Sequence, residues 1–300
     1  MVAADPVRPT GEVERYVRLD AVMARASGEN FPVALRLLPR AARGHLRAVY
    51  GYARLVDSLG DEFSGDRAAA LDWVQDQLDR LFAGAPDHEV FVQLAPTVSR
   101  CGLDREPFDR LLEANRLDQR KTSYADFDEL TQYCRLSANP VGRLVLAVFD
   151  ASTPEHLAVS DEVCSGLQVL EHLQDVGEDA ANGRVYLPAD DMERFGVGVE
   201  DLHASVAGAN LRGLVAYEAG RARTMVASGR RLAASLRGPA RLAVSGFVAG
   251  GLANLDALEA GRFEVLGGAR KAGPVRVLRR FIDVYLAAAA QPRTGSRTTK

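Results

Sequence analysis

Two short acidic segments constrain what this chain can fold into more than any other feature of its sequence. They are Asp57–Glu62, which reads DSLGDE, and Asp175–Asp179, which reads DVGED. In each segment two aspartates stand four residues apart, so on a helix both carboxylates project from one face, about one turn apart. Like charges at this spacing repel each other, and a compensating cation is expected. Carboxylate oxygens suit Mg²⁺, which binds through a few carboxylates, waters and substrate phosphates.

The residues before each acidic segment extend it into a longer polar stripe. Tyr50 and Arg54 precede the first segment at helical spacing, and Gln168 and Glu171 precede the second. Apolar residues accompany both stripes, as in helices that are buried on more than one side; they are Val49, Leu55, Val56, Leu167, Leu170, Leu173 and Val176. A single pair of aspartates is most often a solvated helix face, but a polar stripe on a buried helix costs free energy unless a ligand satisfies it. Two such stripes predict a central cavity in which paired carboxylates clamp a diphosphate.

The composition excludes several other classes of protein. The 300 residues are 47% hydrophobic and show no internal linker, which favours one large domain, and the net charge of −3 gives no reason to expect nucleic-acid binding. Cys101, Cys134 and Cys164 are odd in number and widely spaced, which is typical of reduced thiols in a cytoplasmic protein. The first residues lack the apolar core of a signal peptide, and there is no apolar run long enough to span a bilayer.

Helical periodicity dominates the chain and predicts an all-α fold. We expect one domain over residues 12–290, a disordered N-terminus at 1–11 and a disordered basic tail at 291–300. The segment Ala180–Asp191 is predicted to be a loop, because it contains Asn182-Gly183 and Pro188. Helices are predicted at 12–27, 32–38, 40–60, 67–83, 87–101, 105–120, 126–149, 155–180, 199–235, 239–260 and 273–289.

Signatures of other chemistries are missing from the sequence. A ferritin-like di-iron bundle requires Glu-x-x-His on two helices, whereas Glu171 and His172 are adjacent. The sequence has no Gly-x-Gly-x-x-Gly after a strand, no Walker A motif and no His-Glu-x-x-His. Dinucleotide, P-loop and zinc-protease sites of these kinds are therefore not expected.

Three segments, in this order, resemble the squalene and phytoene synthases, which have the class I isoprenoid-synthase fold. They are Tyr50–Glu62, Tyr133–Arg143, and Leu173–Asp179 continuing to Gly183–Pro188, and the similarity extends over about residues 28–265. The resemblance implies a single-domain helical bundle with a central cavity, a prenyl diphosphate substrate and Mg²⁺ as cofactor.

Two details resemble one branch of this family, the bacterial hydroxysqualene synthases of hopanoid biosynthesis, often named squalene synthases. They are Glu29–Pro32 (ENFP) and Ser137–Arg143 (SANPVGR), in which Ala138-Asn139 replaces the usual Ala-Gly pair. The branch implies conversion of presqualene diphosphate and water to hydroxysqualene and diphosphate, a carbon–oxygen lyase reaction, alongside other squalene and hopanoid enzymes. One alternative is a head-to-head prenyl synthase, a transferase that makes presqualene diphosphate, squalene or phytoene. A less favoured alternative is a non-catalytic relative.

Three departures from the family pattern favour ionisation of a preformed cyclopropyl diphosphate over condensation of two substrates. Ser58 stands where a second adjacent aspartate is frequent, Glu171 replaces an asparagine, and Gly251 occupies the place of a tyrosine.

The resemblance also implies roles for individual residues. Arg54 and Arg184 would contact the diphosphate, although an ion pair between Arg54 and Asp57 is an alternative. From its carboxylate alone, Glu171 could orient the attacking water, and support of the metal site or a buried salt bridge are equal alternatives. Phe31, Tyr50, Tyr133 and Tyr186 are candidates for stabilising the carbocation through their ring faces, with ordinary core packing as the alternative. The metal candidates are Asp57, Asp61, Asp175 and Asp179, with Glu62 and Glu178 as weaker ones. The remaining substrate-binding candidates are Phe31, Tyr133, Ala138, Val141, Gly142 and Gln168.

A basic cluster surrounds the last predicted helix, at Arg270, Lys271, Arg276, Arg279 and Arg280. Apolar residues lie between these basic residues. The combination is compatible with docking on anionic lipid at the inner face of the cell membrane. The alternative, slightly favoured from the sequence, is a solvated basic face whose apolar side packs on the domain.

Overall fold

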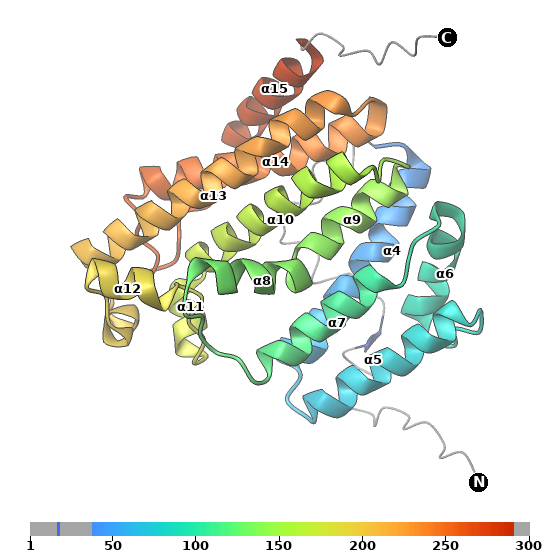
Figure 1. Ribbon diagram of the computed structural model, residues 1–300, viewed down its shortest axis with the longest axis horizontal. Coiled ribbons are helices and arrows are strands. Elements are labelled where there is room, and N and C mark those ends of the chain that lie inside the picture. Colours follow the sequence, from blue (N-terminus) through green and yellow to red (C-terminus); the bar gives the residue numbers. More distant parts are fainter. Residues whose placement is uncertain (1–16, 19–37, 291–300) are drawn as a thin grey trace.

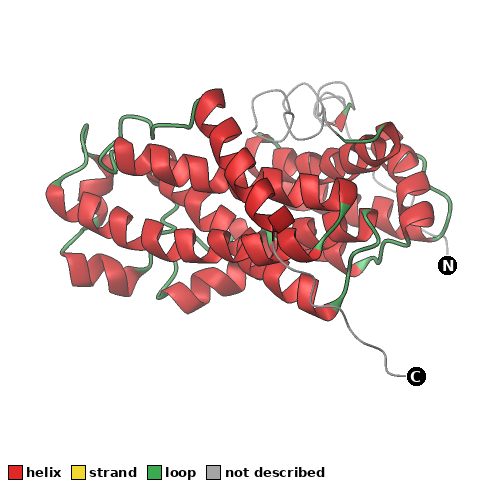
Figure 2. Cartoon of the chain, turned by 90° about the horizontal axis from the view of Figure 1, so that it is seen from above, coloured by secondary structure: helices red, strands yellow, loops and turns green. Residues whose placement is uncertain are grey.

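The structure, a computed structural model, describes residues 17–18 and 38–290. In this part of the chain the only β contact is an isolated bridge between Ser123 and Val185, and Figure 2 shows helices joined by loops. The predicted all-α fold is confirmed. The elements are α4 (Arg40–Asp57), the π-helical turn η2 (Ser58–Glu62), α5 (Arg67–Phe82), α6 (Glu89–Cys101), α7 (Glu106–Asp118), α8 (Phe127–Ser137), α9 (Asn139–Val148), α10 (Pro154–Gln174), α11 (Val176–Ala181), α12 (Ala189–Phe195), the 3₁₀ turn η3 (Val199–His203), α13 (Ala209–Ser235), α14 (Gly238–Ala260) and α15 (Pro274–Ala290).

The helices form two packed groups that meet along α4 and α9. One apolar cluster is built mainly from α8, α10, α13 and α14, and a second one from α4 to α7. A smaller cluster, with Leu46 of α4, Val145 of α9 and Ala243 of α14, lies between them. Figure 1 shows α10, α13 and α14 side by side, with α15 on the outside of this layer. Because the two groups are joined through α4, α9, α10 and α14, these helices surround the space between them.

Side-chain caps fix several of the helix starts. The carboxylates of Asp66 and Asp126 accept the backbone N–H groups of Ala69 and Glu129, which begins α5 and α8. Thr153 caps α10 in the same way, just before Pro154 in the first turn. These local signals explain why most helix starts are close to their predicted positions.

Several predicted helices are interrupted, and this corrects the expected boundaries. The predicted helix at 126–149 breaks at Ala138, because Pro140 has no N–H to donate to the preceding turn. The predicted helix at 155–180 breaks at Asp175, whose φ of −109° and ψ of 13° are not helical. The predicted helix at 40–60 becomes π-helical at Ser58.

Two further boundaries differ from the prediction. The predicted helix at 199–235 consists of the short turn η3 and the separate helix α13, and part of the predicted loop Ala180–Asp191 belongs to α12. The predicted helices at 12–27 and 32–38, the predicted disordered ends and Phe31 fall wholly or largely outside the described residues. None of the helices that the structure describes is long and apolar enough to cross a membrane.

Candidate active site

A cavity of about 350 Å³ lies between α4, α9, α10, α13 and α14. Its volume is within the usual range of small-molecule sites. Its walls are mostly aliphatic, and Tyr50 and Phe247 are the aromatic residues among the lining ones in the described chain. The lining comprises Leu46, Val49, Tyr50, Ala53, Arg54, Asp57, Ser137, Ala138, Val141, Gly142, Val145, Leu146, Ser160, Val163, Cys164, Leu167, Gln168, Glu171, Leu232, Val244 and Phe247.

The cavity becomes polar towards the C-terminal ends of α4 and α10. Arg54 and Asp57 are the last lining residues on α4, and Gln168 and Glu171 are the last ones on α10. Asp57 and Glu171 are also exposed to solvent. The site is thus an apolar pocket with a charged, open end, a shape that can hold a hydrocarbon chain and leave a charged group at the mouth.

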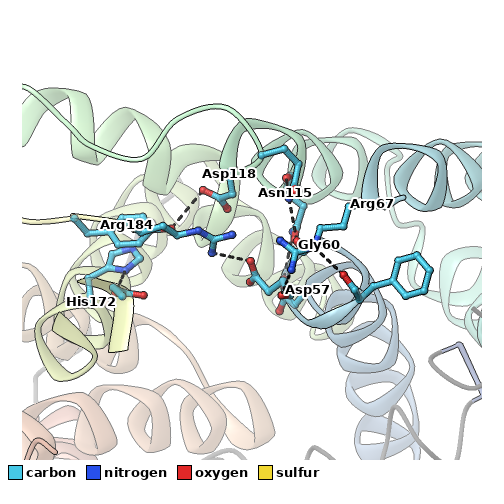
Figure 3. A network of polar contacts seen from close by, with 12 residues as sticks. Asp57, Gly60, Arg67, Asn115, Asp118, His172 and Arg184 are labelled. Atoms are coloured by element: carbon cyan, nitrogen blue, oxygen red, sulfur yellow. Dashed lines mark hydrogen bonds and ion pairs between the residues drawn. The ribbon is translucent and has the colours of Figure 1, made fainter. Parts of the chain in front are cut away.

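The first acidic segment is held in place by two amide side chains, one in α7 and one at its C-terminal cap. The Asn115 amide donates to Asp57 Oδ1 over 3.3 Å, and the Gln119 amide donates to the Gly60 carbonyl over 3.0 Å. A Cβ on Gly60 would lie 2.0 Å from Asn115 Oδ1, so only glycine allows this close approach. Arg67 also donates to the Asp61 carbonyl over 2.7 Å. Figure 3 shows Asp57, Gly60, Asn115 and Arg67 gathered around this turn.

The second acidic segment lies at the break between α10 and α11. Partial burial raises the pKa of Asp175, the neighbouring Asp179 and Glu178 raise it further, and Lys271 lowers it. A partly desolvated carboxylate beside other carboxylates favours the binding of a cation. Gly177 allows the chain to pass close to the backbone of Leu266, because a Cβ there would lie 3.2 Å from the Leu266 carbonyl oxygen.

Two arginines pair with the acidic residues at the mouth of the site. Arg184 donates to Asp61 Oδ1 over 2.7 Å and so connects the segment after α11 to the turn after α4 (Figure 3). Arg54 pairs with Glu62 over 2.7 Å, which differs from the predicted alternative of an ion pair with Asp57. Both arginines therefore lie within reach of an anion that binds between the two acidic segments.

A buried aromatic cluster supports the second acidic segment from behind. Tyr133 donates to Asp118 Oδ2 over 2.8 Å and Tyr186 to Asp118 Oδ1 over 3.4 Å. The His172 ring stacks on Tyr186, with centroids 3.7 Å apart and planes 9° apart, and its Nδ1 lies 3.9 Å from Asp179. Burial raises the pKa of Asp118 to about 6, against the opposing effect of the Tyr133 hydrogen bond.

The structure brings most predicted site residues together at or beside the cavity, and two of them lie away from its lining. Tyr133 and Tyr186 are not among the residues that line the cavity in the described chain; their hydroxyls point to Asp118 instead. The predicted contact of these two rings with the substrate stays a prediction. Eight predicted residues line the cavity, namely Tyr50, Arg54, Asp57, Ala138, Val141, Gly142, Gln168 and Glu171. Asp61, Glu62, Asp175, Glu178, Asp179 and Arg184 belong to the two acidic segments and their arginine partners beside it.

Several residues of the site escape the sequence analysis. Asn115 and Asp118 belong to α7 and Gln119 caps its C-terminus. This helix carries no acidic motif, and only its packing against α4 and α8 reveals the role of these residues. His172 follows Glu171 directly in the sequence and belongs to no motif that would single it out. Lys271, predicted as part of the basic cluster around the last helix, acts electrostatically on Asp175 instead.

Carboxylate oxygens are the ligands that Mg²⁺ prefers, and it commonly uses one or two of them together with substrate phosphates. Within residues 17–18 and 38–290, no three His, Cys, Asp or Glu side chains converge to enclose a metal ion by themselves. Two pairs of aspartates, one in each acidic segment, fit a metal that is completed by a diphosphate. The residues that would hold it are Asp57, Asp61, Asp175 and Asp179.

The chain is similar to known proteins in sequence and in fold. The model of the squalene/phytoene synthase family matches residues 24–280. The hydroxysqualene synthase of Rhodopseudomonas palustris is 35% identical over 210 residues, which cover 70% of this chain and 72% of that protein. The phytoene synthase of Mycobacterium tuberculosis is 34% identical over 188 residues, and the match spans only 62% of either protein. The crystal structure of squalene synthase HpnC from Alicyclobacillus acidocaldarius has 42% identity and a TM-score of 0.75, covering 84% of this chain and 95% of that one.

Proposed function

Because the chain belongs to the squalene/phytoene synthase family, an enzyme family that acts on prenyl diphosphates, we propose that it is a hydroxysqualene synthase. It converts presqualene diphosphate and water to hydroxysqualene and diphosphate, and is therefore a carbon–oxygen lyase. The observation that carries the proposal is the apolar cavity whose polar end is lined by Arg54, Asp57 and Glu171. Beside it, Arg54 pairs with Glu62 and Arg184 pairs with Asp61. The 35% identity to a hydroxysqualene synthase and the 42% identity to a squalene synthase support the choice within the family.

In the proposed reaction, the charged end of the cavity binds the diphosphate. Arg54 and Arg184 exchange their carboxylate partners Glu62 and Asp61 for phosphate oxygens, which accept charge-assisted hydrogen bonds. Asp57, Asp61, Asp175 and Asp179 would hold Mg²⁺, which when bound would supply positive charge next to the leaving diphosphate. Such preorganised electrostatic stabilisation commonly contributes several kcal/mol to barrier lowering.

The apolar part of the cavity protects the carbocation until water reaches it. The aliphatic walls exclude bulk water, and the ring faces of Tyr50 and Phe247 each stabilise a desolvated cation by about 1–2 kcal/mol. Ala138, at the break before α9, and Val141 and Gly142 of α9 have small side chains and form a wall along which a hydrocarbon chain fits.

Water enters at the boundary between the two parts of the cavity. Glu171 lies on the wall at the polar end and is exposed to solvent, so its carboxylate orients one water towards the cation and accepts the proton that the water loses. The new C–O bond forms from the water oxygen, and diphosphate leaves with the electron pair of the broken bond.

Product analysis tests the proposal. The protein is incubated with presqualene diphosphate and Mg²⁺, and the extract is separated by gas chromatography. Hydroxysqualene is expected without any reductant, and a Glu171→Gln variant should form less alcohol. Squalene that appears only with added NADPH, with no alcohol, would refute the proposal in favour of reductive squalene synthesis.

The phytoene synthase relatives, at 34% identity, keep a head-to-head condensing synthase as the second candidate. Incubation with farnesyl or geranylgeranyl diphosphate alone distinguishes the two, because only a condensing enzyme turns them over efficiently. A non-catalytic relative would give no product in any of these assays. It would also show no heat of binding when titrated with a non-hydrolysable prenyl diphosphate and Mg²⁺.

A further inference from the structure

The helix α15 is apolar on two opposite faces. Val284 and Ala288 are buried in the main apolar cluster. On the far side, Val275, Leu278, Ile282 and Leu286 are 80%, 58%, 49% and 60% exposed. This second set, which we call the outer stripe, faces away from the domain.

The spacing of the outer stripe makes it one continuous surface. Its members are three, four and four residues apart, and at about 100° per residue they fall on one side of the helix, roughly opposite to Val284. A surface helix normally carries charged or polar residues there, and a contiguous apolar patch marks an interaction site. The other large exposed hydrophobics of the described chain, Val92, Val199 and Val206, are scattered. The sequence interpretation that the apolar side of this helix packs on the domain is therefore correct for only one of its two faces.

The charges beside the outer stripe are predominantly positive. The acidic neighbours are neutralised within the protein, because Arg280 pairs with Asp256 over 2.6 Å and Arg230 pairs with Asp283 over 2.8 Å. Arg276 and Arg279 form no ion pair with any other described residue. An approaching partner therefore meets an aliphatic strip flanked by two uncompensated arginines.

We propose that the outer stripe of α15 docks this protein on an anionic lipid surface. The inference rests on the proposed function, since substrate and product are long hydrocarbons that must be exchanged with a bilayer. The aliphatic side chains enter the boundary between headgroups and acyl chains, and Arg276 and Arg279 contact lipid phosphates.

A second copy of the chain is a weaker fit to the same surface. Seventeen helical residues extend about 25 Å, and a helix is about 10 Å wide, so one face offers roughly 250 Å². A stable dimer needs about 800 Å² from each partner. A lipid surface requires no complementary shape, and single amphipathic helices are sufficient for it.

Co-sedimentation with vesicles tests the proposal on the full chain without substrate. Vesicles of phosphatidylglycerol and phosphatidylcholine should bind the protein at low salt, and vesicles of phosphatidylcholine alone should bind it more weakly. The double variant Leu278→Ser/Ile282→Ser should bind at least about tenfold more weakly. Arg276→Gln and Arg279→Gln should each reduce binding to the anionic vesicles about fivefold.

The matched control is Val199→Ser/Val206→Ser, which removes two equally exposed valines far along the chain from α15. It should bind like the unaltered protein, and circular dichroism should show the same fold for all variants. Docking is refuted if the control and the α15 variant lose binding equally, or if neither vesicle binds at low salt. It is also refuted if sedimentation equilibrium gives a dimer that only the α15 variant loses, since the stripe is then a protein interface.

The proposed reaction is assayed separately, on presqualene diphosphate dispersed in detergent. A protein that forms alcohol there and ignores vesicles refutes only the docking. A protein that binds vesicles through α15 and forms no alcohol refutes only the reaction.

Discussion

Asp118 is a carboxylate buried between the hydroxyls of Tyr133 and Tyr186, and replacing it with asparagine should stabilise the protein at neutral pH. Burial is the main cause that raises its pKa from 3.8 to about 6, while the Tyr133 hydrogen bond and Arg184 act in the opposite direction. At about 1.4 kcal/mol per pH unit, the ionised form costs the folded state about 3 kcal/mol. Asparagine has the same shape and still accepts the hydrogen bond from Tyr133, but carries no charge to desolvate.

The sign of the pH dependence follows from the direction of this shift. The folded protein holds the proton of Asp118 more tightly than the unfolded chain, so the penalty is absent well below pH 3.8 and complete above pH 6. Relative to the unaltered protein, Asp118→Asn should therefore gain up to about 3 kcal/mol at pH 7 and only about 0.5 kcal/mol at pH 4. The attraction to Arg184 is already included in this figure, because it is one of the causes that lower the pKa of Asp118.

Urea unfolding followed by circular dichroism, with EDTA present at each pH, measures this difference. The control is Asp104→Asn, at an exposed carboxylate that should show no comparable change between pH 4 and pH 7. If Asp118→Asn is less stable than the unaltered protein at pH 7, or if their difference stays constant over this range, the assignment of a buried, penalised carboxylate is wrong.

Other predictions concern the two acidic segments and the cavity. Asp57→Asn and Asp175→Asn should each lower turnover of presqualene diphosphate by orders of magnitude, because each removes a metal-binding charge. The melting temperature should stay equal or rise, because each also removes a repulsion between carboxylates. Near-normal turnover, or an unfolded variant, would show that the aspartate has a structural role. Gly60→Ala should cost about 1–3 kcal/mol in urea unfolding, because its Cβ displaces the Asn115 amide that holds Asp57; an unchanged midpoint contradicts this. Ala138→Leu should leave the fold intact and raise KM or lower kcat by filling the cavity, and unchanged steady-state kinetics would place the substrate elsewhere.

The helices were predictable because their signals are local. The periodicity of apolar residues, the cap at Thr153 and the prolines in first turns act within a few residues of each other, so the sequence contains them directly. The interruptions at Ser58 and Asp175 were missed, because both lie inside strongly periodic segments. The break at Ala138 had a visible signal in Pro140, which we interpreted as part of a continuous helix.

Site residues that lie on one helix could be predicted from the sequence, whereas contacts between residues of different helices could not. The stripe from Tyr50 to Asp57 lies on a single helix, so its spacing shows that its members share a face. The partnership of Asp118 with Tyr133 and Tyr186 joins three separate elements, and no spacing along the chain encodes it. Lys271 was grouped with the basic residues nearest to it in sequence, whereas the fold brings it close enough to Asp175 to affect its pKa.

The three segments that carry the site share one feature, which is that each contains an interruption of a helix. The first changes from α to π at Ser58, the second breaks at Ala138 and the third breaks at Asp175. Residues at the ends of helical segments are where a chain absorbs rotation with the least loss of packing. We therefore expect the helices on either side of these three interruptions to tilt as rigid rods around the cavity. In hydrogen exchange, the amides around these three residues should open independently of the core and become protected when a diphosphate binds.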